Sequence, residues 1–383
     1  MGTTKARSTV LLRDDVGKRD WVDFVKGVAI ILIVAYHAAL FLTSTGMDIA
    51  GIGRARIVLD LFPMPAFFLI SGMFQARIGT WSFADLWRRR LRQYLYLYVL
   101  WSVIRFIFYL IAPNVRSDGA GSSAQDPLAL LGILFWPISS YWFIYALFLF
   151  TLVVWVFRKA PIAVLLAIAA VVGAFAASGM LDTGNSGFNR MAEYLIFFVI
   201  GTAFHRRIYS AVESTRAWKA FLLWAAFLAF CGLVFAAPIA IYVPGVVLVG
   251  EALVVAAVFS LAVYLVRLRF LGWVSYIGQR ALNIYLVHVF VIALFAAGLS
   301  LIPAFDDPLP DRGLLLLAGM TAAVIVVSIV LTRYLTRVSW LFVYPFRAKT
   351  PRSVPASERD RAPDGGAATT EVQKRPDDTR GEV

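Results

Sequence analysis

Long apolar stretches recur along this chain up to about residue 345. Each is roughly 20 residues long, the length that an α-helix needs to cross the hydrocarbon core of a bilayer. The chain is 60% hydrophobic and only 15% charged, whereas a soluble domain carries about 25% charged residues. Lipid offers the backbone no hydrogen-bond partners, so helices are the expected spanning form. The sequence therefore predicts an all-α polytopic membrane protein.

We predict about ten membrane-spanning helices and one shorter interfacial or re-entrant piece at 128–137. The expected helices cover 22–44, 57–75, 93–112, 140–157, 161–179, 190–204, 220–236, 244–266, 281–302 and 313–332. The first stretch resembles a signal peptide in its basic start and apolar run. It is long, contains His37 and precedes many further spans, so we expect it to be retained.

Lysine and arginine orient these predicted helices. When the N-terminus is placed in the cytoplasm, all but six of the 36 Lys and Arg residues fall on the cytoplasmic side. The exceptions are Arg105, inside the third helix, and five residues in outer segments: Arg54, Arg56, Arg116, Arg190 and Arg312. This asymmetry fits the positive-inside rule and predicts that both termini are cytoplasmic. Topology thus explains the net charge of +13, and no nucleic-acid partner is expected.

Three regions follow from the change in composition. Residues 1–20 form a cytoplasmic N-terminal segment, 21–346 the membrane domain, and 347–383 a polar tail expected to be disordered. The single cysteine, Cys231, cannot form an intrachain disulfide. We expect a lipid bilayer as the surroundings, and the bacterial inner (plasma) membrane as the location.

The first predicted helix carries a polar stripe. Lys26 and His37 are eleven residues apart, so they share one face and lie about 16 Å apart along the axis. Asp23 lies next to Lys26 at i, i+3. Ionisable groups in a membrane are costly and often functional, and an imidazole suits proton transfer near neutral pH. The alternatives are that His37 only bonds to a neighbouring helix and that Lys26 snorkels to the interface.

A basic run precedes the third helix. It holds four arginines in five residues, more than one helix end needs to set its orientation in the membrane: Arg88, Arg89, Arg90 and Arg92. Guanidinium groups are well suited to bind phosphates. Attraction to anionic lipid headgroups is the equal alternative. Ser71, beside Gly72 in the second helix, is a candidate ligand donor or a packing residue.

Four further side chains are candidates for a substrate path. Arg105 lies mid-helix and needs a partner or a wet cavity, for which Glu251 and Glu193 are candidates. Trp142 belongs to an aromatic group typical of a membrane interface, although such rings also stack on sugars. His288 lies seven residues into the ninth helix, with functional and structural roles open. No metal site, prosthetic group or nucleotide motif is expected from the residue spacing.

Several motifs in order resemble those of the acyltransferase-3 family of integral membrane acyltransferases. They are VDFVKGVAIILIVAYH, FPMPAFFLISGMF, RRRLRQYLYLYVLW, YWFIYALF and SYIGQRALNIYLVH, and the resemblance covers about residues 20–345. Lys26 stands where arginine is commoner, which is similar to a fucose-acetylase-like branch of sugar O-acetyltransferases. An extracytoplasmic hydrolase-like domain that many relatives carry is not expected in this polar tail.

The resemblance implies O-acetylation of an envelope or exported carbohydrate, with cytoplasmic acetyl-CoA as acyl donor and a carbohydrate or glycolipid as acceptor. It assigns His37 as general base or acyl carrier, with Asp23 beside it on the stripe. The CoA would then be held by five side chains: Lys26, Arg88, Arg89, Arg92 and Ser71. Succinyl transfer to a glucan-type acceptor, and a carrier of lipid-linked sugar without chemistry, are the alternatives.

Overall fold

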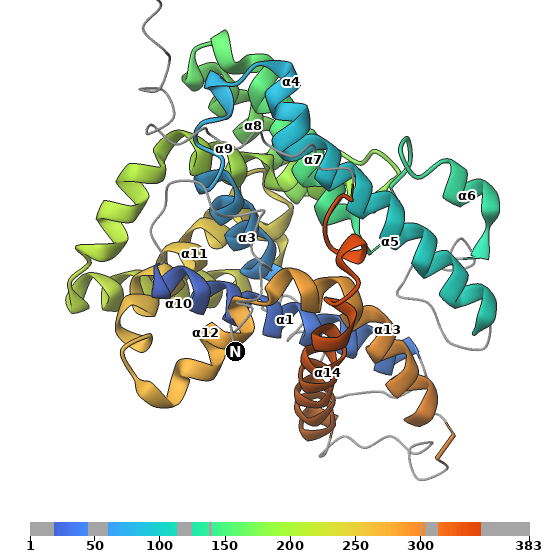
Figure 1. Cartoon of the computed structure of the whole chain (residues 1–383). Helices are drawn as coiled ribbons and strands as arrows, with labels where there is room; N and C mark the ends of the chain where they lie inside the picture. The colour runs from blue at the N-terminus through green and yellow to red at the C-terminus, as the bar shows by residue number, and fades with distance from the viewer. Residues whose placement is uncertain are drawn as a thin grey trace, which may run out of the picture. The chain divides into compact units, whose positions relative to one another are not determined.

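The computed structural model describes residues 19–44, 60–112, 125–137, 140–299, 301–302 and 313–345. The predicted tail 347–383, nearly all of the predicted segment 1–20, and the predicted start of the second helix at 57–59 lie outside these residues. Within them the chain is helical and contains no strand, as predicted (Figure 1).

Each of the ten predicted spans contains a helix. Among the described residues, eight helical segments are long and apolar enough to cross a membrane. They are built on α1 (Asp20–Ser44), α5 (Arg92–Ile111), α7 (Trp142–Val156), α9 (Ser186–Glu213), α10 (Ala217–Ala236), α11 (Val246–Leu265), α13 (Ala281–Leu299) and α14 (Gly313–Leu335). The other two, α3 (Pro63–Met73) and α8 (Ile162–Ala177), are shorter. The 16 residues of α8 rise about 24 Å, less than the roughly 30 Å of a bilayer core.

The two largest differences between predicted and observed boundaries lie at the third and sixth spans. The third span begins at Phe83 rather than 93, because α4 (Phe83–Leu86) and a π-helical turn (Trp87–Leu91) lead directly into α5. The sixth predicted helix ends at 204, whereas α9 continues to Glu213 with a kink at Phe204. The basic run is therefore helical, and His205 lies within α9.

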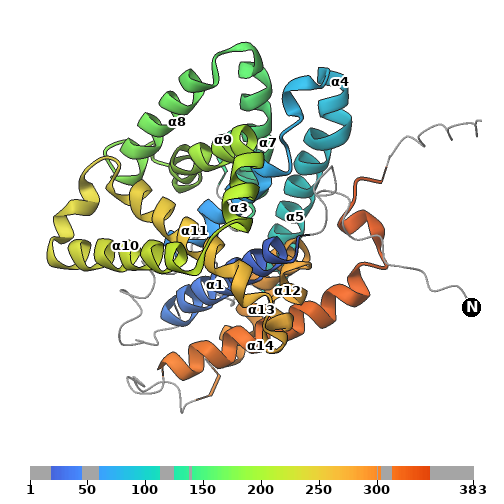
Figure 2. The same ribbon diagram turned by 90° about the vertical axis from the view of Figure 1, so that its left-hand side faces the viewer.

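Helix α1 contacts α3, α11, α12 (Gly272–Gly278), α13 and α14. The other long helices pack mostly in neighbouring pairs: α9 on α3 and α8, α10 on α11, and α5 on α7 (Figure 2). The short helix α12, which we did not predict, is tied to α14 by Arg333, which donates a hydrogen bond to the Tyr276 hydroxyl at 2.9 Å. That bond lowers the pKa of Tyr276.

Glycines set the closest helix contacts. A Cβ on Gly72 of α3 would lie 2.2 Å from the Phe198 oxygen, and one on Gly201 of α9 would lie 2.1 Å from the Leu69 oxygen. Between α1 and α12, a Cβ on Gly278 would lie 1.8 Å from the Asp23 oxygen. Small residues allow such close approach of backbones in membranes. These contacts hold α3 against α9, and α12 against the start of α1.

Candidate active site

Two histidines from distant parts of the chain lie side by side. His37 of α1 and His288 of α13 have ring centroids 5.2 Å apart. His288 is 1% exposed. The Nδ1 atom of His37 is also buried, and no residue that the structure describes offers it a hydrogen bond. A buried polar atom of this kind is uncommon and calls for a functional or structural explanation.

The orientation of His288 follows from its own helix. Its Nδ1 atom lies 2.7 Å from the Tyr285 carbonyl oxygen. A carbonyl only accepts hydrogen bonds, so Nδ1 carries the hydrogen and Nε2 keeps its lone pair in the neutral ring. Tyr285 donates its hydroxyl to the Ser140 carbonyl at 2.6 Å, and Tyr141 donates to the Leu286 carbonyl at 2.8 Å. These bonds fix this part of α13 against the start of α7.

Asp23 and Lys26 form a buried ion pair at the other end of the same helix. Lys26 Nζ lies 2.7 Å from Asp23 Oδ1, and the two side chains are 8% and 14% exposed. Asp23 is fourteen residues before His37, which places it about 21 Å away along the axis. The structure thus pairs Asp23 with Lys26 and does not bring it to His37.

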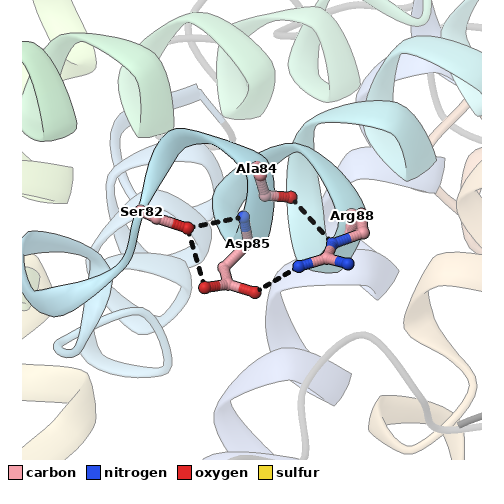
Figure 3. Close-up of polar contacts among 4 residues, drawn as sticks. All are labelled: Ser82, Ala84, Asp85 and Arg88. Atoms are coloured by element: carbon pink, nitrogen blue, oxygen red, sulfur yellow. Dashed lines mark hydrogen bonds and ion pairs between the residues drawn. The ribbon is translucent and has the colours of Figure 1, made fainter.

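The basic run spreads its side chains in several directions. Arg88 donates to Asp85 at 2.9 Å and to the Ala84 carbonyl at 3.2 Å, while Ser82 caps the backbone of Asp85 (Figure 3). The guanidinium of Arg89 lies 5.4 Å from the ring centroid of Trp81. Arg88 and Arg89 are exposed, but Arg90 is 2% exposed. Arg90 lies in the five-residue π-helical turn Trp87–Leu91, in which hydrogen bonds join residues five apart, and its side chain is turned inward.

Arg92 lies under a segment that follows α14. Its guanidinium is 5.0 Å from the ring centroid of Tyr344. Three side chains of α5 donate to backbone carbonyls of this segment: Gln93 to Phe342, Tyr96 to Trp340 and Trp101 to Leu341. Residues 339–345 therefore pack along α5 next to the basic run.

Comparison with known families identifies the family of this chain. A family model described as an acyltransferase domain matches residues 19–333, most of the chain. The chain belongs to the acyltransferase-3 family. No curated protein and no solved structure matches it. The protein is thus an acyltransferase and a multi-pass membrane protein, and the predicted family is confirmed.

In the acyltransferase, Ser71 lies in the contact between α3 and α9. It is 7% exposed and precedes Gly72, whose backbone meets Phe198. Gly72 thus allows a close approach of the two backbones. A role of Ser71 toward a ligand stays a prediction.

The glutamates considered as partners of Arg105 lie elsewhere in the enzyme. Arg105 is 5% exposed, and its guanidinium is 5.2 Å from the ring centroid of Tyr109. Among the described residues, Glu193 pairs with Arg190, Nη1 to Oε2 at 3.4 Å, and the carboxyl of Glu251 interacts with that of Glu193. Arg190 also forms an ion pair with Asp60.

Trp142, the remaining path candidate, is adjacent to this second polar group. Its ring is stacked on that of Tyr194, with centroids 6.2 Å apart and 23° between the planes. Arg190 donates to the Tyr194 hydroxyl at 2.8 Å. Trp142 and Glu251 were expected on the substrate path separately, and the structure brings them to one cluster.

Sequence reasoning missed the contributions of Arg190, Asp60 and Tyr194. Arg190 was counted only as an outer charge for topology, although it precedes Glu193 by three residues, the spacing of helix ion pairs. That spacing was the available signal. The contact of Arg190 with Asp60 and that of Glu193 with Glu251 carry no local sequence signal, because each joins residues of different helices.

Proposed function

We propose that this acyltransferase moves an acetyl group from cytoplasmic acetyl-CoA to a hydroxyl of an envelope or exported carbohydrate in the bacterial inner membrane. The observation that carries the proposal is the ring contact between His288 of α13 and His37 of α1, the helix that also holds Lys26. Within the family, a lysine at position 26, where arginine is commoner, favours the branch that acetylates sugars such as fucose.

The donor would lie along α1. Its phosphates would meet Lys26, Arg88, Arg89 and Arg92, since guanidinium and ammonium groups bind phosphate oxygens. His37 is about 16 Å from Lys26 along the helix, and the pantetheine arm is a long thin chain suited to reach it. Lys26 is already paired with Asp23 at 2.7 Å, so Asp23 would tune its charge rather than act on the acceptor.

His37 would act as the general base. As the acceptor hydroxyl attacks the thioester carbonyl carbon, the imidazole takes the hydroxyl proton. The tetrahedral intermediate then loses CoA as the carbon–sulfur bond breaks, and the histidine returns the proton to the leaving thiolate. A covalent acyl-histidine is the alternative route to the same products. His288 would hold the imidazole of His37 in place through the ring contact.

The test uses the full chain in nanodiscs with acetyl-labelled acetyl-CoA and a carbohydrate extract of the host envelope. We expect His37→Ala to lower kcat about 10²–10⁴-fold, the range of general acid–base catalysis. His205→Ala, a matched histidine substitution in α9, should retain the wild-type rate. Equal rates in folded His37→Ala and wild type would refute the assignment of the base.

The donor and acceptor classes need a separate measurement. Succinyl-CoA run beside acetyl-CoA tests the acyl group, and faster succinyl transfer would contradict the acetyl assignment. Mass spectrometry of envelope glycans with and without the protein should show loss of acetyl groups from one sugar.

A further inference from the structure

A polar cluster separate from the histidine pair lies between α9 and α11. It consists of Asp60, Arg190, Glu193, Tyr194 and Glu251, and we call it the Arg190 cluster. Arg190 donates to Tyr194 at 2.8 Å and contacts Glu193 at 3.4 Å and Asp60. Two carboxyl groups thus share one guanidinium, and the third, that of Glu251, interacts with the carboxyl of Glu193. The cluster is rich in hydrogen-bond acceptors and short of donors.

One acceptor of the cluster is unsatisfied. Glu251 is 1% exposed, and its Oε2 atom has no hydrogen-bond partner in the part of the chain that the structure describes. Leaving a buried polar atom unpaired carries a free-energy cost. A ligand that brings hydrogen-bond donors would remove that cost.

The cluster is closed at one end and open at the other. Glu193 and Glu251 are almost fully buried, whereas the side chains of Arg190 and Asp60 are 35% and 29% exposed. A ligand can therefore approach from the side of Arg190 and Asp60 and bring its donors toward the glutamates.

An aromatic surface adjoins the cluster. Tyr194 is fully buried between Phe68, at a centroid distance of 5.8 Å, and Trp142, at 6.2 Å. Trp142 is only half-buried, so it is the ring of this stack that a ligand can reach. A flat apolar ring beside hydrogen-bonding side chains is the usual composition of a site that binds an amphipathic small molecule.

The Arg190 cluster is also near the proposed catalytic pair. Arg190 lies within electrostatic range of Tyr36, the residue before His37. The rings of Tyr36 and His37 have centroids 5.6 Å apart. Tyr36 thus lies near both groups.

We propose that the Arg190 cluster and Trp142 form the acceptor subsite, and that it takes a neutral polyhydroxylated ring rather than an acidic or phosphorylated one. This proposal rests on the proposed function for the identity of the reaction. The hydroxyls would donate to Glu193 and Glu251, and the apolar face of the ring would stack on Trp142. The excess of carboxyl groups would repel an anionic ligand.

A metal ion is the other ligand that carboxyl groups suit. The described residues contain no group of three His, Cys, Asp or Glu side chains placed to hold one. A metal would also make no use of the stacked indole. The polyhydroxylated ring accounts for both the acceptors and the aromatic surface.

Binding is tested directly, without acetyl-CoA, by saturation-transfer NMR on the full chain in nanodiscs. The probes are methyl α-glucopyranoside, methyl α-fucopyranoside and methyl β-glucuronide. We expect signal from at least one neutral probe and about tenfold weaker signal from the glucuronide. Glu251→Gln and Trp142→Phe should each weaken binding of that neutral probe about tenfold, since glutamine offers one acceptor oxygen in place of two and phenylalanine a smaller ring.

Matched substitutions outside the cluster serve as controls. Glu213→Gln alters a glutamate at the other end of α9, where it pairs with Arg19, and Trp218→Phe alters an exposed tryptophan of α10. Both should bind the neutral probe like wild type.

Three results would overturn the subsite: no signal from either neutral probe, equal binding of the glucuronide, or unchanged binding in both folded cluster variants. These outcomes do not depend on whether the protein transfers an acetyl group. Binding of a neutral probe without any acetyl transfer would refute the proposed function alone. Acetyl transfer that is unchanged in the Glu251 and Trp142 variants would refute the subsite alone.

Discussion

The hydrogen bond of His288 to the Tyr285 carbonyl can be reproduced by an asparagine side chain. The Asn Nδ2 atom occupies nearly the place of the imidazole Nδ1, so His288→Asn can keep the bond to the Tyr285 carbonyl while removing the ring beside His37. We expect the unfolding temperature in detergent to stay near that of wild type and kcat to fall about 10²-fold. His288→Ala removes both the hydrogen bond and the ring, so it should lower both the unfolding temperature and kcat. Wild-type kcat in His288→Asn would show that His288 is purely structural.

Variants of the buried Asp23–Lys26 ion pair can distinguish a role of the pair in stability from a role of Lys26 in donor binding. Lys26→Met leaves the Asp23 carboxylate buried without its cation, a change that typically costs about 3–5 kcal/mol. We expect a clear drop in unfolding temperature. Asp23→Asn combined with Lys26→Met removes both charges and should recover most of that loss.

The same double variant tests whether Lys26 binds the donor. If Lys26 holds a CoA phosphate, the KM for acetyl-CoA should stay raised about tenfold after stability is restored, as expected for one lost charge-assisted contact. Recovery of both stability and KM would make the ion pair structural only. The steady-state rate at varied acetyl-CoA concentration decides between these results.

At the scale of helices, reciprocal glycines hold α3 against α9. A Cβ at Gly201 would lie 2.1 Å from the Leu69 oxygen, so Gly201→Ala must force the two backbones apart. Overpacking of this kind costs about 1–3 kcal/mol. We expect a lower unfolding temperature in detergent and reduced activity.

A glycine without such a contact provides the control. A Cβ at Gly232 of α10 meets nothing within 4 Å. Alanine there should be neutral or stabilising by about 0.5–1 kcal/mol, because glycine weakens a helix interior. Equal destabilisation by Gly201→Ala and Gly232→Ala would contradict the role of close packing.

At the scale of the whole molecule, the charge asymmetry makes a topological prediction. The α8–α9 connection should lie outside and the α9–α10 connection in the cytoplasm. In a Cys231→Ser background, we expect Met180→Cys to react with an impermeant maleimide in right-side-out vesicles. Ser214→Cys should react only in inside-out vesicles. The reverse pattern would invert the orientation and remove cytoplasmic acetyl-CoA as the donor.

Much of the architecture could be read from local sequence. The length of each apolar stretch predicts a helix, because a backbone in lipid must satisfy its own hydrogen bonds, and the ten predicted stretches all contain one. The polar stripe of α1 likewise follows from helical geometry, and so does the contact of Lys26 with Asp23 at i, i+3. The kink at Phe204 and the early start of the third span were missed, since both lie where polar residues continue a helix beyond its apolar part.

The neighbours of each helix were decided by tertiary packing. Hydropathy reports how apolar a stretch is and not the shape of its surface, yet the backbone contacts at Gly72, Gly201 and Gly278 require the absence of a side chain. The sequence by itself determined that the chain has helices of membrane length and that His37 and Lys26 share a face. Only the tertiary structure brought His288 to His37 and Glu251 to Glu193, because contacts between helices depend on which surfaces fit closely and leave no periodic signal along the chain.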